Sequence, residues 1–443
     1  MKEKISFSQV LVLGFALFAM FFGAGNLIFP PSLGITCGEN WLGAFGAYIL
    51  VDAGLAMLAL IASFRCDGGL EQISQYQLGR MPSLLLIAMN ALCLGPLVAI
   101  PRTASTTFEI AFAPLLPGLS SWVFALIYFA IVVLLCLKPG KVVDIIGKVL
   151  SPVMFVALLV LIGLGVLFPL GSIEGGLDLT ASLKMGLENG YQTMDMLGGL
   201  LFAVVTMMSV TQMGFTQKKS RLKIVSLSGL FASGALFLVY GGLAYLGATA
   251  STLPEMQGLP ATALLLSITH ALTGSWGGIL LGVIVAAACL TTAIGLVSSC
   301  AETFVCLSNG KLPYKPLVIG FSLISLVLSN LGTGTIITVA SPILEIIYPI
   351  FMILMIFSFF QEKIHNRNIF KGAVLMALGI TLMAEIGKRL PTPFIPDFLP
   401  LYELGLYWIL PAVLGGLLGA LIPEKPKKQV QAAPLSPQTE KTF

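Results

Sequence analysis

The chain has 443 residues, of which 57% are hydrophobic and only 10% are charged, and its mean hydropathy is +0.97. So apolar a composition leaves too little polar surface to cover a water-soluble globule, and it provides many runs long enough to cross a bilayer. The net charge of +4 comes from basic residues in short loops, which is not the pattern of a nucleic-acid-binding protein. Seven cysteines without CxxC or Cys/His spacing indicate neither a disulfide framework nor a metal site. These features predict a multi-pass protein of the lipid bilayer.

Apolar runs between charged and Pro/Gly-rich breaks predict about twelve membrane-spanning helices, and therefore an all-α polytopic fold. Their approximate limits are 7–35, 41–63, 82–111, 120–137, 146–169, 190–216, 223–248, 276–306, 316–331, 336–360, 370–388 and 402–422. The amphipathic segment 253–274, between the seventh and eighth spans, predicts a further helix that lies over the outer face.

Basic residues are distributed unevenly between the predicted loops. With these spans, all but four of the 24 Lys and Arg residues fall on one side of the membrane. The exceptions are Arg102, Lys184, Lys388 and Arg389. Because short loops rich in Lys and Arg remain cytoplasmic, we expect both termini to be cytoplasmic, and the even number of spans agrees.

The first span contains FFGAGNLIFPP at residues 21–31, a segment that is unusual for a membrane helix. Two glycines, an asparagine and a Pro-Pro pair make a continuous helix costly at this depth. Broken membrane helices are tolerated where they are buried in protein or line a cavity. In secondary transporters they hold the substrate, because free N–H groups face an anion and freed carbonyls coordinate a cation. The interruption predicts a solute transporter.

A second interruption, Met194–Leu200, falls in the sixth span, which enters from the opposite side of the membrane. Two broken helices five spans apart predict an inverted repeat, although Gly198 and Gly199 are also typical of close helix packing. The predicted units are a first repeat at 1–170, a second repeat at 171–362, two further spans at 363–422 and a disordered cytoplasmic tail at 423–443.

The string FGAGNLIFPP at residues 22–31, in a chain of about twelve spans, resembles the bacterial branched-chain amino acid:cation symporters (BrnQ-type, or LIVCS, carriers). The resemblance extends to Tyr191–Asp195 and to the basic loop that follows. It implies the broken-helix (LeuT-like, or APC) fold of amino acid/cation symporters. It also implies uptake of leucine, isoleucine and valine with Na⁺ or H⁺ across the bacterial cytoplasmic membrane. No other cofactor, nucleic acid or obligate protein partner is expected.

A zwitterionic amino acid requires donors for its carboxylate, acceptors for its ammonium group and a pocket for its side chain. The amides of Gly23, Ala24 and Gly25 are the candidate donors, and we expect the second half-helix to start near Leu27. Asn26 either holds the break open, contributes an oxygen to an ion or caps that half-helix. Further candidates for the substrate site are Asp195, Met196, Leu197, Gly198, Gly199, Phe202 and Leu296.

Asp195 is a buried acid beside the second break, and such residues are functional candidates inside a membrane. It can orient the break, meet the substrate ammonium group, carry a coupling proton or cap a helix. In the third span, Arg102 and Glu109 lie seven residues apart on one helical face, which predicts a buried pair or a gate. Asp52 is a weaker candidate.

The resemblance also implies a sodium site. In the broken-helix amino acid symporters, two hydroxyls and one alanine carbonyl of the eighth span bind sodium together with two carbonyls of the first span. By that pattern the Na⁺ ligands are Ala19, Phe22, Ala288, Thr291 and Thr292. The alternative is that both threonines donate hydrogen bonds to their own helix backbone.

Other functions remain open from the residues alone. A carrier for another neutral amino acid or small nitrogenous solute fits the same features. A channel would need a continuous water-filled path, which two broken helices in a repeat do not favour. Catalysis is not expected, because the two histidines, His270 and His365, form no nucleophile–base pair or metal cluster.

Overall fold

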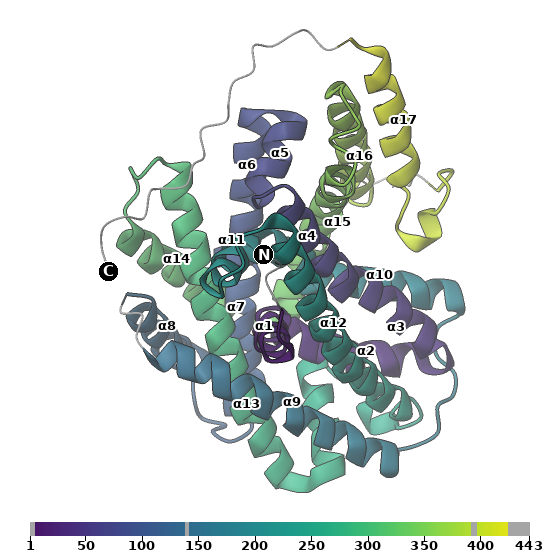
Figure 1. Cartoon of the computed structure of the whole chain (residues 1–443). Helices are drawn as coiled ribbons and strands as arrows, with labels where there is room; N and C mark the ends of the chain where they lie inside the picture. The colour runs from purple at the N-terminus through teal and green to yellow at the C-terminus, as the bar shows by residue number, and fades with distance from the viewer. Residues whose placement is uncertain (1–4, 138–140, 391–396, 424–443) are drawn as a thin grey trace.

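The computed structural model describes residues 5–137, 141–390 and 397–423, with the backbone alone described for 141–151. The described chain folds into one helical bundle (Figure 1). Its α-helices are α1 Phe7–Phe21, α2 Ala24–Cys37, α3 Trp41–Ile49, α4 Leu55–Arg65, α5 Leu70–Leu78, α6 Arg80–Leu92, α7 Ala99–Thr107, α8 Ser121–Leu137, α9 Lys141–Leu167, α10 Leu179–Thr193, α11 Asp195–Gln212, α12 Lys218–Thr249, α13 Ala261–Leu307, α14 Tyr314–Ser329, α15 Thr333–Ser358, α16 Asn368–Gly387 and α17 Ile409–Leu421.

Each predicted span coincides with a helix or a pair of consecutive helices. Seven helical stretches of the described chain are long and apolar enough to cross a membrane, and five shorter apolar helices accompany them. The first span is α1 with α2, the second α3 with α4, the third α6 with α7, and the sixth α10 with α11. The polar helix α5 was not predicted, because its sequence is too short and hydrophilic to register as a span. The predicted tail after residue 423 lies outside the described residues.

Three π-helical turns lie within the spans: η2 at Leu50–Gly54, η3 at Cys93–Leu97 and η4 at Phe108–Phe112. Short 3₁₀ turns occupy Gly38–Asn40 (η1), Pro254–Met256 (η5) and Tyr402–Leu404 (η6). The helix α13 bends at Gly274, which has a φ of +68° that a residue with a Cβ rarely adopts. The part before this bend falls in the predicted amphipathic segment 253–274, and the part after it is the eighth span.

The first helix break is narrower than the sequence predicts. Only Phe22 and Gly23 leave the helical conformation, and α2 begins at Ala24 rather than near Leu27. Pro30 and Pro31 lie inside α2, where their missing N–H groups remove bonds without ending the helix. Asn26 is the third residue of α2 and not its cap, because the N-cap position belongs to Gly23.

The second break is also narrower than the predicted interruption, Met194–Leu200. It is a single residue, Met194, in the left-handed conformation (φ 64°, ψ 18°), and α11 continues without interruption through Gly198 and Gly199. The two glycines are therefore not the break. Asp195 is the first residue of α11, where a carboxylate interacts favourably with the helix dipole.

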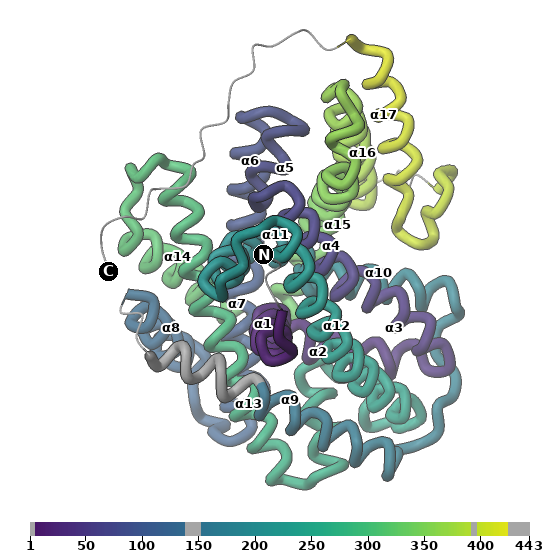
Figure 2. Tube along the Cα trace, viewed as in Figure 1, coloured from purple at the N-terminus to yellow at the C-terminus, as the bar shows by residue number. Residues whose placement is uncertain are grey.

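Packing between the helices follows the predicted inverted repeat. In the first repeat α1 and α2 both pack against α12, which is the second span of the other repeat. In the second repeat α10 packs against α3 and α11 against α4, which together form the second span of the first repeat. The tube in Figure 2 shows these segments side by side although they are far apart in sequence. Each broken helix is thus held by the opposite repeat.

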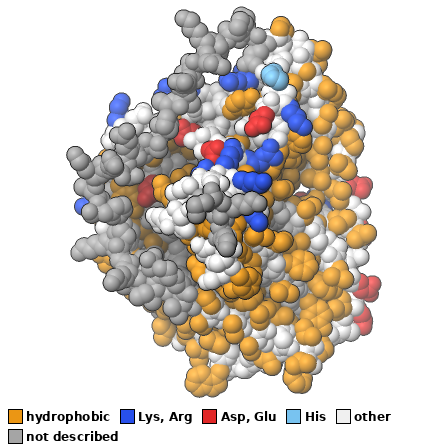
Figure 3. All heavy atoms as spheres, viewed as in Figure 1, with side chains coloured by type: hydrophobic (Ala, Val, Ile, Leu, Met, Phe, Trp, Pro, Cys, Tyr) orange, Lys and Arg blue, Asp and Glu red, His pale blue; other side chains and the backbone are white. Residues whose placement is uncertain are grey.

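Hydrophobic side chains cover most of the lower and right-hand part of the face seen in Figure 3, while most of its Lys and Arg side chains gather in the upper middle. Many large apolar residues are exposed on the bundle, including Met81, Leu230, Trp276 and Leu421. Exposed apolar patches of this extent are typical of a surface that contacts lipid. The described residues therefore form a multi-pass membrane protein.

Candidate functional site

A cavity lies where the two helix breaks meet the third and eighth spans. Its walls combine apolar side chains with a small number of polar groups, the usual composition of a small-molecule site. The lining residues are Met20, Phe21, Gly23, Ala24, Asn26, Leu94, Ala99, Arg102, Thr103, Thr193, Met194, Asp195, Gly198, Phe202, Thr292 and Leu296. The two breaks, distant in sequence, thus share one cavity.

The first break leaves backbone groups without partners. Among the described residues, the carbonyls of residues 19–22 accept no backbone hydrogen bond, and the amides of residues 23–26 donate none. The cause is local: Phe22 and Gly23 are extended, so the bonds between a residue and the fourth one before it cannot form across them. Donors and acceptors are therefore both available beside the cavity.

Arg102 lies against the first break and is only 4% exposed. Its Nη1 donates a hydrogen bond of 2.7 Å to the carbonyl of Gln192, next to the second break, and its guanidinium lies 5.6 Å from the ring centre of Phe29. A Cβ added to Gly25 would lie 2.8 Å from Nη2 of Arg102. Gly25 does not line the cavity, but its missing side chain makes room for this guanidinium.

The predicted pairing of Arg102 with Glu109 is wrong. Glu109 instead accepts hydrogen bonds of 2.8 Å from the Thr333 amide and from Thr262 Oγ1, which ties the third span to α15 and α13. Two residues that are seven positions apart share one helical face only in a regular α-helix. Glu109 lies in the π turn η4, which changes that register. Its role in a gate remains a prediction.

Asn26 links the two breaks through its side chain. Its Nδ2 donates hydrogen bonds to Asp52 Oδ1 at 3.1 Å and to Asp195 Oδ2 at 2.9 Å. Asn26 and Asp195 line the cavity, whereas Asp52 is fully buried behind them in the π turn η2. Sequence reasoning ranked Asp52 low, because its meeting with Asn26 and Asp195 depends on three spans packing together.

The two threonines of the predicted sodium site have different positions. Thr291 Oγ1 and Thr292 Oγ1 both donate to the carbonyl of Ala288, at 2.8 and 2.9 Å, as in the alternative considered from sequence. Each hydroxyl oxygen still has lone pairs that a cation can use. Only Thr292 lines the cavity, and its Cγ2 lies 4.0 Å from a Cβ built on Gly23. The free carbonyls of Ala19 and Phe22 belong to the same break.

The remaining predicted residues divide into two groups. Gly198, Phe202 and Leu296 line the cavity, while Met196 and Leu197 are buried elsewhere in the core. A Cβ on Gly199 would lie 2.8 Å from the carbonyl of Ala56, so this glycine permits close packing of α11 on α4. Sequence reasoning missed several lining residues, because ordinary apolar and hydroxyl residues give no signal of their own: Met20, Phe21, Leu94, Ala99, Thr103, Thr193 and Met194.

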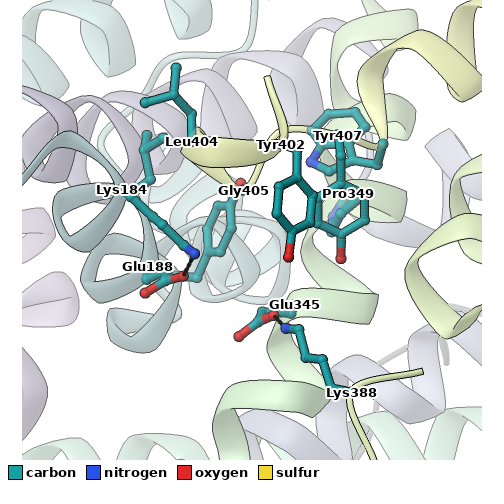
Figure 4. Close-up of a pocket in the computed structure, with 12 residues that line it drawn as sticks. Lys184, Glu188, Glu345, Pro349, Lys388, Tyr402, Leu404, Gly405 and Tyr407 are labelled. Atoms are coloured by element: carbon teal, nitrogen blue, oxygen red, sulfur yellow. Dashed lines mark hydrogen bonds and ion pairs between the residues drawn. The ribbon is translucent and has the colours of Figure 1, made fainter. Parts of the chain in front are cut away.

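A second pocket lies on the side predicted to be extracellular. Figure 4 shows Lys184 with Glu188 and Lys388 with Glu345 around it, and the rings of Tyr402 and Tyr407 beside them. The Nζ of Lys388 lies 2.8 Å from Glu345 Oε2. Tyr191 also lines this pocket, and its ring centre is 4.6 Å from that of Tyr348, deeper in the core.

Comparison with known proteins gives consistent results. A family model described as "Branched-chain amino acid transport protein" matches residues 6–426. The branched-chain amino acid permease BraB of Bacillus subtilis is 36% identical over 437 residues, covering 95% of this chain and 97% of that protein. The permease BrnQ of Escherichia coli K12 is 33% identical over 442 residues, covering 98% of this chain and 100% of that protein.

Solved structures share the fold. The inward-facing conformation of Mhp1 has a TM-score of 0.63 at 14% identity, covering 93% of this chain and 90% of that chain. MhsT in complex with L-phenylalanine has a TM-score of 0.53 at 16% identity, covering 92% of this chain and 98% of that chain. At these identities the likeness concerns the fold alone, and it confirms the predicted broken-helix architecture.

Proposed function

Because the chain belongs to the branched-chain amino acid transport protein family, and is therefore a transporter rather than an enzyme, we propose that it imports leucine, isoleucine and valine by cation-coupled symport. The relatives named above are branched-chain amino acid permeases. The observation that carries the proposal is the cavity at the two helix breaks, where unpaired backbone groups, one cation, one acid and an apolar wall come together. The proposed location is the bacterial cytoplasmic membrane.

Recognition of the amino acid follows from the polar groups around the cavity. The unpaired amides of Gly23 and Ala24 and the guanidinium of Arg102, for which Gly25 makes room, bind the carboxylate at the positive end of the α2 dipole. Asp195 and the free carbonyls of the first break accept the ammonium protons. Charge-assisted hydrogen bonds of this kind are the strongest that a neutral zwitterion can make.

Selection of the side chain follows from the apolar part of the wall. Phe21, Leu94, Phe202 and Leu296 surround the space that remains once the charged ends of the substrate are placed. Apolar pockets separate analogues that differ by one methylene only about 10- to 200-fold. We therefore expect one carrier to accept leucine, isoleucine and valine and to disfavour polar side chains.

The proposed coupling ion is Na⁺, with H⁺ as the alternative. The carbonyls of Ala19 and Phe22 and the hydroxyl of Thr292 are hard, uncharged oxygen ligands of the kind that a monovalent cation takes. Ala288 and Thr291 complete the proposed set. An ion here would join the first break to the eighth span, so that its binding favours the same helix arrangement as substrate binding.

Alternating access requires a barrier on each side of the site. On the outer side we propose that Tyr191 and Tyr348 separate the charged pocket of Figure 4 from the central cavity. The hydrogen bonds from Thr333 and Thr262 to Glu109 hold the outer ends of the third and tenth spans together. Opening toward the outside would break these bonds, which is the proposed gating role of Glu109.

The test is uptake of labelled leucine by purified protein in liposomes, under an inward Na⁺ gradient and, separately, under a pH gradient. Accumulation that excess isoleucine and valine suppress, and excess alanine does not, supports the proposal. Leucine equilibration without accumulation under either gradient would indicate a channel instead. Accumulation suppressed equally by alanine would indicate a broader neutral amino acid carrier.

A further inference from the structure

We propose that Asp52 and Asp195 hold one proton between their carboxyl groups, and that this proton enters the cell together with the amino acid. The coupling part of this inference rests on the function proposed above, whereas the existence of the proton site does not. The arrangement combines a fully buried acid, a second acid that lines the cavity and one amide that bridges them.

The two carboxyl groups are neighbours as well as partners of the same amide. Asn26 Nδ2 lies 3.1 Å from one and 2.9 Å from the other, and the two side chains are also within hydrogen-bonding range of each other. Two carboxylates cannot donate to one another, and Asp52 Oδ2 then has no hydrogen-bond donor among the described residues. One proton resolves this, because an O–H group on one aspartate donates to the other.

Burial makes the doubly ionised state unfavourable. Asp52 is 0% exposed and Asp195 6% exposed, and within the described chain neither forms an ion pair with a cation at 4 Å or less. Two like charges in a site that excludes water repel strongly and lose their hydration, so such a pair shares a proton. The pair therefore has one negative charge rather than two.

One cationic side chain and three tyrosines surround the acid pair. Arg102 of α7 is the one cationic side chain that lines the cavity with Asp195. The other titratable groups that interact with the two acids are Tyr48 of α3, Tyr240 of α12 and Tyr348 of α15. All three hydroxyls are buried without a hydrogen-bond partner among the described residues. None of them donates to either acid, so Arg102 is the group that balances the single negative charge of the pair.

Charge balance links the proton to the substrate. The amino acid brings one carboxylate for Arg102 and one ammonium group for the acid pair, so it adds no net charge. With both aspartates ionised and no Na⁺ bound, the loaded site would carry one uncompensated negative charge, and one proton removes it. The proton is thus the coupling ion here, the alternative to Na⁺ named above. Asp195 takes that proton from a hydronium ion while the cavity is open to the outside, so that an O–H bond forms and water is left. The O–H bond breaks when the cavity opens to the opposite side, where a water molecule accepts the proton as hydronium. One proton thus crosses with each amino acid.

The proton site is tested first without substrate. Infrared difference spectra of the purified protein, in H₂O and D₂O, compare wild type with Asp52→Asn. We expect wild type to show the C=O stretch of a protonated carboxyl group, shifted in D₂O, and the variant to lack it. Glu255→Gln, which removes an exposed acid of the outer loop, is the matched control and should leave the band unchanged. A band of equal size in Asp52→Asn would overturn the proposal.

A measurement on wild type alone guards against misfolding of the variant. The same carboxyl band should disappear as the pH of the wild-type sample is raised; a band that is absent at every pH contradicts the site. Coupling is then read in liposomes from a pH-sensitive dye inside the vesicles. Leucine added outside should acidify the interior of wild-type and Glu255→Gln vesicles, and not that of Asp52→Asn vesicles.

The outcomes separate the two proposals. If wild type accumulates leucine with no acidification, the proton is not transported and the coupling inference is wrong, although the carrier function stands. Equal acidification per leucine in Asp52→Asn would also exclude the pair. If wild type takes up no leucine at all, the function proposed above fails, and the infrared band still decides whether the proton site exists.

Discussion

The two helix breaks differ in the way they interrupt a helix. The first spans two extended residues, Phe22 and Gly23, and leaves several backbone donors and acceptors unpaired. The second is the single residue Met194, where the Met194 amide donates to Tyr191 and the Gly198 amide donates to Met194, while the amides of residues 195–197 donate no backbone hydrogen bond among the described residues. The first break therefore leaves more backbone groups unpaired than the second, which also positions the side chain of Asp195.

This difference assigns separate tasks to the two repeats. A residue without a Cβ lets a ligand approach the backbone closely, and Gly23 of the first break is such a residue on the cavity wall. At the second break a left-handed residue turns the chain once and places Asp195 at the start of α11, facing Asn26. This assignment is tested by variants that impair ligand binding by the backbone of the first break, or side-chain positioning by the second, but not both.

The largest effect is expected for Gly25→Leu. The new side chain would collide with the guanidinium of Arg102, whose Nη2 lies 2.8 Å from a Cβ at this position, and with the ring of Phe29. Leucine uptake should fall to background while the protein remains in the membrane. Gly46→Leu in α3, where an added Cβ meets nothing within 4 Å, is the control. Near-normal uptake by Gly25→Leu would exclude the first break as the carboxylate site.

A smaller but specific effect is expected for Arg102→Gln. Loss of a charge-assisted bond to the substrate carboxylate should raise the leucine KM about 10- to 100-fold. Arg102→Lys keeps the positive charge but cannot form two parallel hydrogen bonds with a carboxylate, so it should recover part of the affinity for leucine. If uptake by Arg102→Gln falls through its maximum rate with KM unchanged, then Arg102 serves the hydrogen bond to Gln192 rather than the substrate.

Thr292→Ala should raise the Na⁺ concentration needed for half-maximal uptake, and Thr291→Ala should do so less, because only Thr292 lines the cavity. The double variant should show the largest increase in this Na⁺ concentration. Thr292→Ser, which keeps the hydroxyl, should behave as wild type. The measurement is leucine uptake as a function of external Na⁺. An unchanged Na⁺ dependence in the double variant would place the ion elsewhere.

The smallest effects come from neighbouring glycines of α11. Gly199→Ala pushes a methyl group toward the Ala56 carbonyl at 2.8 Å and should destabilise the protein by about 1–3 kcal/mol with little change in KM. Gly198→Ala meets only the Phe202 ring, at 3.4 Å, and should change KM or the preference among the three substrates without lowering the thermal unfolding temperature. The reverse pattern would mean that the two glycines exchange roles.

Sequence predicted the spans and the first break well, for physical reasons. Long apolar runs form helices in a bilayer, because a helix satisfies its own backbone hydrogen bonds there. Gly, Asn and Pro mark a helix that cannot continue regularly. The second break was predicted too wide, at Met194–Leu200, because Gly198 and Gly199 suggested an interruption while Met194 is a helix-forming residue with no signal for a left-handed conformation. Its conformation depends on the surrounding packing, which a local pattern does not contain.

The site itself was predicted only in part. Gly23, Ala24, Asn26 and Asp195 were predicted because they lie in or beside the two helix interruptions that the local sequence marks, and all four line the cavity. The contact of Asp52 with Asn26 was not predicted and Arg102 was paired with the wrong partner, since both assignments need the relative rotation of three helices. That rotation is changed by π turns, which a helical period of 3.6 residues does not predict.

Those π turns have an evolutionary consequence. A π turn corresponds to one residue more than an α-helix needs, so the loss of a single codon within Leu50–Gly54 would restore a regular helix. The helices on either side would keep their faces, because the π turn absorbs the extra residue, but the side chains within the turn would change direction. Asp52 would leave Asn26 without any change in its own identity. Gain or loss of the contact between Asp52 and Asn26 is thus one insertion or deletion away, with no substitution at either residue.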